Sequence, residues 1–221
     1  MKKLKIVSGR FTFIFSLIIL FATTCKKENK IYYAIEGDKL SGTINGITTG
    51  DIDYVVAYLE DTEQYIVGAD SVNTTNFSVE LVTPPDQFMQ KYTSDSGIVI
   101  SDTSVRYCNL YIECFKNGNL VGSLVRLSSN YVLFTLTLQK GDVICNFIYV
   151  DKKVSITGQT FENDAFLARD MVTNYNNLSF KAGWNEIILK CEEVEVDSYT
   201  FSTASNNEPG GIEWYLLVPV D

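Results

Sequence analysis

Hydrophobic and polar residues alternate with a period of two along most of the chain after residue 38. Such alternation is typical of β-strands with one buried face, and no segment shows the sustained spacing of an amphipathic helix. Four segments show it most clearly: Thr75–Leu81, Arg106–Phe115, Tyr131–Leu138 and Ile212–Val218. Weaker alternation marks Lys39–Asn45, Asp53–Glu60, Tyr65–Asp70, Leu120–Leu127, Val143–Val150, Val154–Thr157, Leu178–Lys181 and Glu186–Val196.

Turn residues separate these segments. Asn117 and Gly118 both tolerate positive φ and predict a tight type I′ hairpin, and Lys140-Gly141-Asp142 is consistent with another. Pro84-Pro85-Asp86 ends a strand, and Asp86 could cap one short helix that reaches Tyr92. Short strands at this spacing predict an all-β fold, an antiparallel β-sandwich over residues 38–221. Trp184 and Trp214 are expected to anchor its core.

The number of sandwiches is open. The longest polar interval, residues 84–102, is where a domain boundary would fall. One continuous sandwich is favoured because the strands before this interval are too few to bury a core alone. Two packed sandwiches are the alternative.

The N-terminus has the pattern of an export signal. Basic residues up to Arg10 precede the apolar stretch Phe11–Ala22. A membrane-spanning helix needs roughly 20 apolar residues, so this stretch predicts a cleavable signal peptide. Small residues follow, then Cys25, and then the charged segment Lys26–Lys30.

This junction resembles the lipobox of bacterial lipoproteins, particularly those of Bacteroidota, although Thr24 stands where Gly, Ala or Ser is usual. The resemblance implies a signal peptide over residues 1–24 and a lipidated Cys25 that begins a tether over residues 25–37. It also implies an outer-membrane lipoprotein that faces the cell surface or the periplasm. An ordinary secretory signal with an incidental cysteine is the alternative.

Charge narrows the range of partners. The chain has 18 basic and 27 acidic residues, a net charge of −9. Loss of residues 1–24 removes four basic residues and leaves 14 against 27, a net charge of −13. Such a surface repels nucleic-acid phosphates and anionic lipids. We therefore expect no nucleic-acid partner, and contact with the membrane only through the lipid on Cys25.

The sequence contains no histidine, which excludes imidazole bases, His-dependent triads and His-ligated zinc. The cysteines that follow Cys25 form no C-x-x-C motif, so we expect no metal and no cofactor. They lie among apolar residues, which favours buried free thiols, with one or two disulfides as the alternative. These four residues are Cys108, Cys114, Cys145 and Cys191.

Carboxylates do not mark an active site. Glu193, Glu195 and Asp197 alternate along one expected strand face, where they could help to bind Ca²⁺ or keep a sheet edge soluble. Strand spacing puts them roughly 6.8 Å apart, which favours the second interpretation. A His-independent glycoside hydrolase needs a specific carboxylate pair, and none stands out. The protein is therefore not expected to be an enzyme.

One strand carries a candidate binding strip. Tyr107, Tyr111 and Phe115 alternate on the face opposite Cys108 and Cys114. Two polar residues interleave with these rings. Exposed aromatic rings can stack on sugars while polar neighbours bind hydroxyls, although a centrally placed strand could instead bury both faces. The candidate ligand-binding residues are Tyr107, Asn109, Tyr111, Glu113 and Phe115.

Two further patterns support an exported protein. Asp70-Ser71-Val72 resembles the short O-glycosylation acceptor of Bacteroidota, with Ser71 as the modified residue. Gly42–Gly46, Asp53–Glu60 and Asp70–Leu81 together resemble transthyretin-like or carboxypeptidase-regulatory-like β modules of exported Bacteroidota proteins. Tyr149–Gly158 and Leu178–Asn185 look like segments of uncharacterised lipoproteins of that group. The resemblance implies a β-sandwich of immunoglobulin-like or transthyretin-like type in the cell envelope and transfers no catalytic residue.

Together these patterns predict a lipid-anchored, non-catalytic protein of the cell envelope that binds a glycan, another ligand or a protein partner. The alternative is a structural or accessory subunit of a surface assembly, such as a fimbria or an uptake complex. An assembly subunit joined by donor strands would need an exposed groove and a detachable strand.

Overall fold

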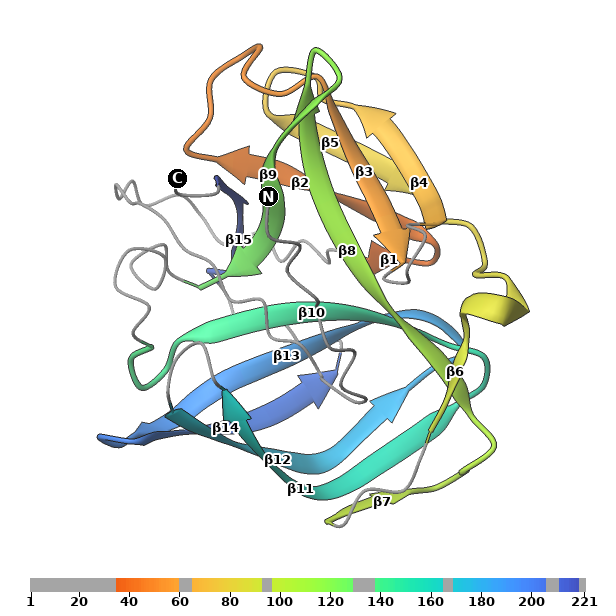
Figure 1. The fold of residues 1–221 in the computed structure, drawn as a ribbon, viewed down its shortest axis with the longest axis vertical. Helices are drawn as coiled ribbons and strands as arrows, with labels where there is room; N and C mark the ends of the chain where they lie inside the picture. Colours follow the sequence, from red (N-terminus) through yellow and green to blue (C-terminus); the bar gives the residue numbers. More distant parts are fainter. Residues whose placement is uncertain are drawn as a thin grey trace, which may run out of the picture.

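The computed structural model describes residues 35–59, 65–92, 97–128, 138–164, 169–205 and 211–218. These residues form fifteen β-strands and one short 3₁₀ turn (Figure 1), which confirms the all-β prediction. The expected signal peptide, Cys25 and most of the expected tether lie outside the described residues, as does nearly all of the expected strand Tyr131–Leu138.

The strands gather into an upper and a lower group in Figure 1. The upper group contains β1 (Ile35–Glu36), β2 (Lys39–Asn45), β3 (Tyr54–Leu59), β4 (Tyr65–Ser71), β5 (Asn76–Glu80), β9 (Asn119–Leu127) and β15 (Glu213–Leu217). The lower group contains β6 (Gln90–Lys91), β7 (Ile98–Ile100), β10 (Val143–Val150), β11 (Val154–Asp164), β12 (Arg169–Phe180), β13 (Gly183–Val194) and β14 (Ser198–Ser205). The long strand β8 (Arg106–Lys116) runs from one group to the other.

Hydrogen bonds join all fifteen strands into one mixed sheet, in the order β1-β2-β15-β9-β8-β10-β13-β14-β12-β11-β7 along its main path. Most pairings are antiparallel, as expected, but β12 with β14 and β15 with β2 are parallel. β10 pairs with the lower part of β8 and with the end of β9, and so it spans the gap where these two strands separate.

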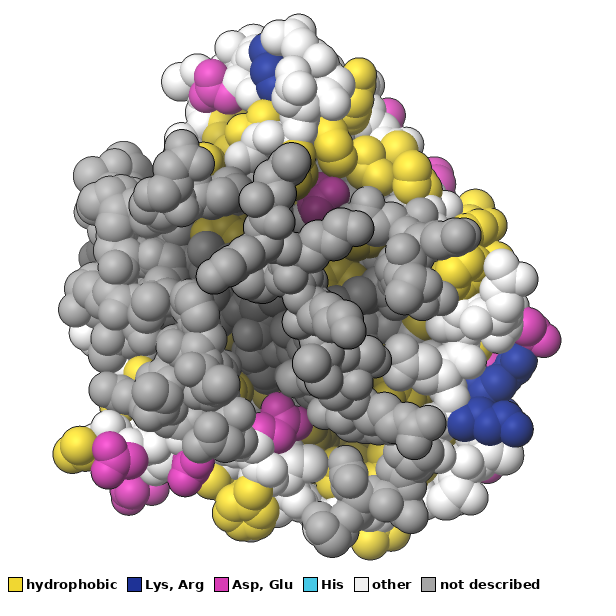
Figure 2. Space-filling view, viewed as in Figure 1, with side chains coloured by type: hydrophobic (Ala, Val, Ile, Leu, Met, Phe, Trp, Pro, Cys, Tyr) yellow, Lys and Arg dark blue, Asp and Glu magenta, His cyan; other side chains and the backbone are white. Residues whose placement is uncertain are grey.

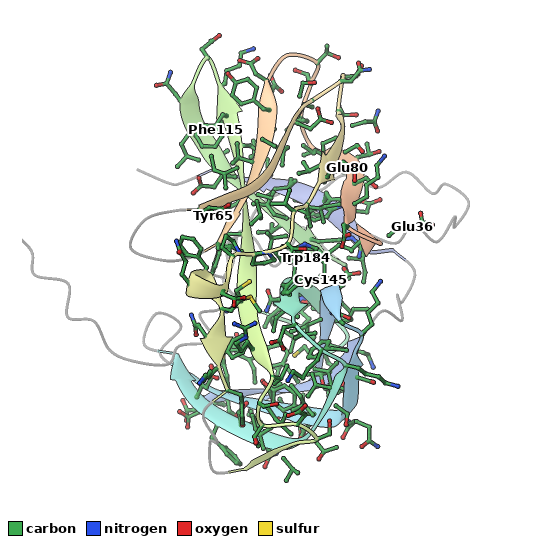
Figure 3. All side chains as sticks on the ribbon, turned by 90° about the vertical axis from the view of Figure 1, so that its right-hand side faces the viewer. Glu36, Tyr65, Glu80, Phe115, Cys145 and Trp184 are labelled. Atoms are coloured by element: carbon green, nitrogen blue, oxygen red, sulfur yellow. The ribbon has the colours of Figure 1, made fainter. Side chains whose placement is uncertain are left out.

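Two hydrophobic cores lie on opposite faces of the shared strands. The first core is built around Trp214 and Trp184, and the second around Phe180, Tyr199 and Phe201. Figure 3 places Trp184 between the upper and lower strands. Both tryptophans are buried, which confirms them as core anchors.

β10 shows why the alternation of its sequence is weak. Cys145 and Phe147 belong to the first core, whereas Ile144 and Ile148 belong to the second. A strand that is buried on both faces reads as an almost continuous apolar run, because neither face meets water. The interval 84–102, named as the place where a domain boundary would fall in the two-sandwich alternative, contains the 3₁₀ turn, β6 and β7.

The turns follow the residues that specify them. Asn117 and Gly118 both have positive φ, 50° and 76°, and connect β8 to β9 as a type I′ hairpin requires. Asp53 holds this hairpin, because its carboxylate accepts hydrogen bonds from the Asn117 N–H at 2.6 Å and the Lys116 Nζ at 2.8 Å. These bonds, the one to Asn117 foremost, lower the pKa of Asp53.

The prediction of a short helix from Asp86 to Tyr92 was wrong in the length of the helix. The helical segment is a single 3₁₀ turn, Asp86–Phe88. Gln90 and Lys91 instead pair with Tyr107 and Arg106 of β8. The backbone hydrogen bonds that a longer helix would use are therefore taken by the sheet.

Candidate functional site

The outer side of β3 and β8 carries a group of aromatic residues around one carboxylate. The strand register places Tyr54 opposite Phe115 and Tyr58 opposite Tyr111, with Glu113 between these pairs. Residues of β3 on the other side, such as Val55 and Ala57, are fully buried in the first core. We call Tyr54, Tyr58, Tyr111, Glu113 and Phe115 the aromatic face.

Two contacts fix the centre of the aromatic face. The rings of Tyr58 and Tyr111 stack with their centroids 5.7 Å apart and their planes 28° apart. The Tyr58 hydroxyl donates a hydrogen bond of 2.9 Å to Glu113 Oε1. All three side chains are half-buried. The carboxylate is therefore held in a defined position beside two rings.

Apolar side chains surround this centre. Tyr54 is 42% exposed and Ile66 of β4, which lies opposite Tyr58, is 59% exposed. Leu120 of β9, opposite Phe115, is 52% exposed. Figure 2 shows hydrophobic side chains over the region of β3 and β4, and Figure 3 shows Phe115 in the upper part of the molecule, near the end of the β8–β9 hairpin. Exposed apolar groups that gather in one place mark interaction sites.

The arrangement suits a ligand that is apolar on its faces and polar on its edges. Aromatic rings provide flat apolar contact, and the Glu113 carboxylate can accept hydrogen bonds from hydroxyl groups. A pyranose ring presents this combination of C–H faces and hydroxyl edges. Contact with such a ligand needs only the rings and the fixed carboxylate that this surface presents.

The structure divides the strip that the sequence suggested. Tyr111, Glu113 and Phe115 lie together, but Tyr107 is only 8% exposed and belongs to the second core. Asn109 lies between Tyr107 and Tyr111 along β8, where it is half-buried and opposite Ile148 of β10. The reason is that β8 passes from one core to the other, so the side of the strand that faces outward at Phe115 faces a core at Tyr107. The expectation that Tyr107 shares an exposed surface with Tyr111 is therefore wrong.

Sequence reasoning missed the contribution of β3. Tyr54 and Tyr58 share one side of the strand expected over Asp53–Glu60, and their spacing was a usable signal. Their contact with Tyr111 and Phe115 depends on the pairing of β3 with β8, which joins residues more than fifty positions apart in the sequence.

Acidic residues elsewhere do not assemble a site within the described residues. Glu193, Glu195 and Asp197 are exposed at and beyond the end of β13, and Glu195 receives a hydrogen bond from the Ser198 hydroxyl at 3.3 Å. No group of three potential metal ligands occurs in the part of the chain that the structure describes.

The four cysteines are buried free thiols, as expected. Burial raises the pKa of Cys108 and Cys114 to about 12 and that of Cys191 to about 11. A thiol that stays protonated at neutral pH is a poor nucleophile and a poor metal ligand. These residues therefore act as small hydrophobic core residues.

Ser71, the expected modification site, is exposed at the end of β4. Its N–H donates a hydrogen bond of 2.8 Å to Asp70 Oδ1. It pairs with Tyr54 across the strands, so it borders the aromatic face. Its glycosylation stays a prediction.

Comparisons with known proteins add no further information on the site. No protein family, curated protein or solved structure matches this chain. The resemblance to Bacteroidota lipoproteins and to transthyretin-like modules thus stays a prediction. Within the described residues, no helix is long and apolar enough to cross a membrane.

Proposed function

We propose that this protein is a non-catalytic binding protein of the bacterial cell envelope, held to the membrane by a lipid on Cys25, and that it binds glycan through the aromatic face. The observation that carries the proposal is the stacked pair Tyr58 and Tyr111 with the Glu113 carboxylate fixed beside it. Tyr54 and Phe115 extend the apolar surface along the same two strands.

Physical chemistry favours a sugar as the ligand over the other classes of partner. The excess of 27 acidic over 18 basic residues disfavours phosphate-rich ligands. A protein partner would bury a larger apolar area, whereas this surface combines a few rings with one oriented carboxylate. Rigid rings on paired strands also lose little conformational freedom on binding.

The anchor is the second part of the proposal. The basic residues, the apolar stretch Phe11–Ala22 and Cys25 support export followed by lipid attachment. One diacyl or triacyl group supplies the two or more chains that stable attachment needs. The net charge makes binding to anionic lipid surfaces through the folded part unfavourable.

Affinity electrophoresis of the purified protein in gels that contain bacterial or host polysaccharides tests the binding function. We expect retention by at least one polysaccharide, and loss of that retention in Tyr54→Ala. The matched control is Phe161→Ala, because Phe161 is an exposed aromatic residue of β11, 72% exposed, outside the aromatic face. The control should be retained as strongly as the wild type.

Absence of retention on a broad glycan array would overturn the glycan proposal. If the same protein then co-purified in a stable surface assembly, the alternative function as an accessory subunit would replace it. Retention that is equally strong in Tyr54→Ala and in Phe161→Ala would place the glycan elsewhere on the molecule.

A further inference from the structure

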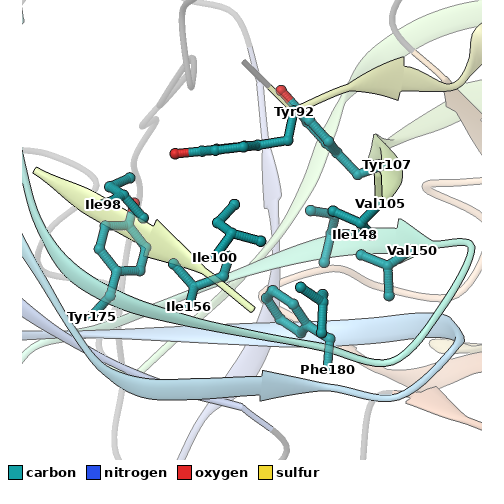
Figure 4. Close-up of a pocket in the computed structure, with 11 residues that line it drawn as sticks. Tyr92, Ile98, Ile100, Val105, Tyr107, Ile148, Val150, Ile156, Tyr175 and Phe180 are labelled. Atoms are coloured by element: carbon teal, nitrogen blue, oxygen red, sulfur yellow. The ribbon is translucent and has the colours of Figure 1, made fainter. Parts of the chain in front are cut away.

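An apolar pocket lies in the second core, on a different part of the molecule from the aromatic face. β7 forms one side of the pocket, Tyr92 and the lower end of β8 form another, and β10, β11 and β12 contribute the remaining walls. Figure 4 shows the lining side chains. Its walls include Ile98, Ile100, Ile156, Tyr107, Tyr175 and Phe180.

The walls exclude a polar ligand from the interior of the pocket. Their exposed surface is entirely apolar, and no charged side chain lines it. Tyr175 contributes its ring, while its hydroxyl hydrogen-bonds to Thr160, and burial raises its pKa to about 12. In Figure 4 the hydroxyls of Tyr92 and Tyr107 lie at the edge of the group of side chains, so polar groups are found at the margin of the pocket.

The pocket is small and extended. About 440 Å³ of space lies between and in front of its walls, and because this figure includes open solvent at the mouth, the enclosed part is much smaller. The lining side chains form a row that runs from Tyr175 and Ile98 at one end to Phe180 and Val150 at the other (Figure 4). This shape suits a slim, linear ligand.

Two glycines fix the wall that β7 provides. A Cβ atom at Gly158 would lie 2.0 Å from the carbonyl oxygen of Gly97, and a Cβ at Gly97 would lie 2.3 Å from that of Gln159. The pairing of β11 with β12 is also irregular between Ile156 and Gly158, and such bulges redirect side chains. β7 can approach β11 closely only because both positions are glycine, and this approach brings Ile98 and Ile100 to the pocket.

We propose that this pocket binds a single-chain amphiphile, with its linear alkyl or acyl chain between β7 and β8 and its polar head at the mouth beside Tyr92 and Tyr107. The apolar walls favour an alkyl or acyl chain over a polar group, and the row of lining side chains favours a linear chain over a branched or cyclic one. The pocket and the aromatic face share no residue, so each proposal can be tested and rejected independently of the other.

Titration calorimetry with 1-hexanol, 1-octanol and 1-decanol tests the proposal on the purified protein. Each added methylene should tighten binding about fourfold until the pocket is full, because burial of one methylene contributes roughly 0.8 kcal/mol. Ile100→Phe fills the pocket and should weaken 1-octanol binding at least about tenfold. Ile100→Ala enlarges the pocket and should move the chain length at which affinity stops rising toward 1-decanol, an effect that unfolding cannot produce.

Val99 provides the matched control. It lies between two pocket residues of the same strand, yet it is 69% exposed, so Val99→Phe adds the same ring outside the pocket. This control and Tyr111→Ala should bind the alcohols as the wild type does. The proposal would be overturned by affinities that do not depend on chain length, or by equal binding in Ile100→Phe and Val99→Phe.

Discussion

Arg126 of β9 and Glu186 of β13 form an ion pair inside the protein, across the intervening strand β10. Their side chains are only 3% and 4% exposed. The Arg126 guanidinium also lies 5.9 Å from the centre of the Trp214 ring, which stacks on Phe147. The register places both charged side chains on the first-core face of β10, beside Cys145 and Phe147, where desolvation makes an uncompensated charge costly.

Glu186→Gln should destabilise the protein strongly. The substitution removes the negative charge beside a buried guanidinium, and the loss of one partner of a buried pair costs about 3–5 kcal/mol. Urea unfolding monitored by tryptophan fluorescence measures the change. The double variant Arg126→Met with Glu186→Leu should recover most of the lost stability, because it removes both charges and keeps the volume.

The exposed pair Lys39 and Glu80 is the control for the buried one. Its atoms are 3.8 Å apart, and its side chains are 49% and 75% exposed. Exposed pairs contribute about 0–1 kcal/mol, so Glu80→Gln should change the unfolding midpoint little. Equal effects of Glu186→Gln and Glu80→Gln would contradict the role given to the buried pair.

Gly158→Ala should cost more stability than Gly141→Ala. Both glycines have positive φ, 117° and 96°, so alanine is strained at either position by about 1–3 kcal/mol. A Cβ at Gly141 meets no atom within 4 Å, whereas at Gly158 it would collide with the backbone of Gly97. Thermal unfolding compares the two variants, and hydrogen exchange of β7 should rise only in Gly158→Ala. Equal stability and equal hydrogen exchange in the two variants would mean that the fold does not depend on the close approach of β7 to β11.

The buried thiols predict a loss of stability at alkaline pH. The pKa of Cys108 and Cys114 rises from the ordinary value of 9.0 to about 12 on folding. The unfolded chain therefore releases these protons before the folded protein does, and the free energy of unfolding falls as pH rises above about 9 toward 12. Urea unfolding at a series of pH values should show a shallower fall in Cys108→Ala than in the wild type. An unchanged slope would contradict the prediction.

The number of reactive thiols tests the lipid anchor. The chain has five cysteines, and four of them are buried free thiols in the described part of the structure. Iodoacetamide should modify few of these four in the native protein and all four after denaturation, because unfolding exposes them. In protein isolated from membranes, lipidated Cys25 should not react. A fifth modified thiol would show that Cys25 is unlipidated.

Alternation along the sequence located strands best where one face is less buried than the other. The expected strand Arg106–Phe115 corresponds to β8, Arg106–Lys116. The signal was weaker for Val143–Val150, which is β10, because both of its faces are buried and its apolar residues hardly alternate. The parallel pairing of β12 with β14 has no local signal, because it depends on strand order rather than on any turn sequence.

The candidate site was predictable only in part for a related reason. Tyr111, Glu113 and Phe115 share a face by simple alternation, and the structure keeps them together. Tyr107 obeys the same alternation but lies where β8 has entered the second core, a change of environment that no local pattern reveals. Tyr58 joins the site through long-range pairing alone.

Calorimetric titration of the protein with a retained polysaccharide fragment tests the central claim, that the aromatic face binds glycan, most directly. We predict that Tyr111→Ala lowers the affinity for this fragment at least about tenfold, which corresponds to about 1.4 kcal/mol. Glu113→Gln should weaken it to a smaller extent, and Phe161→Ala should leave it unchanged. Equal dissociation constants for the wild type, Tyr111→Ala and Phe161→Ala, with all three proteins folded, would contradict the account.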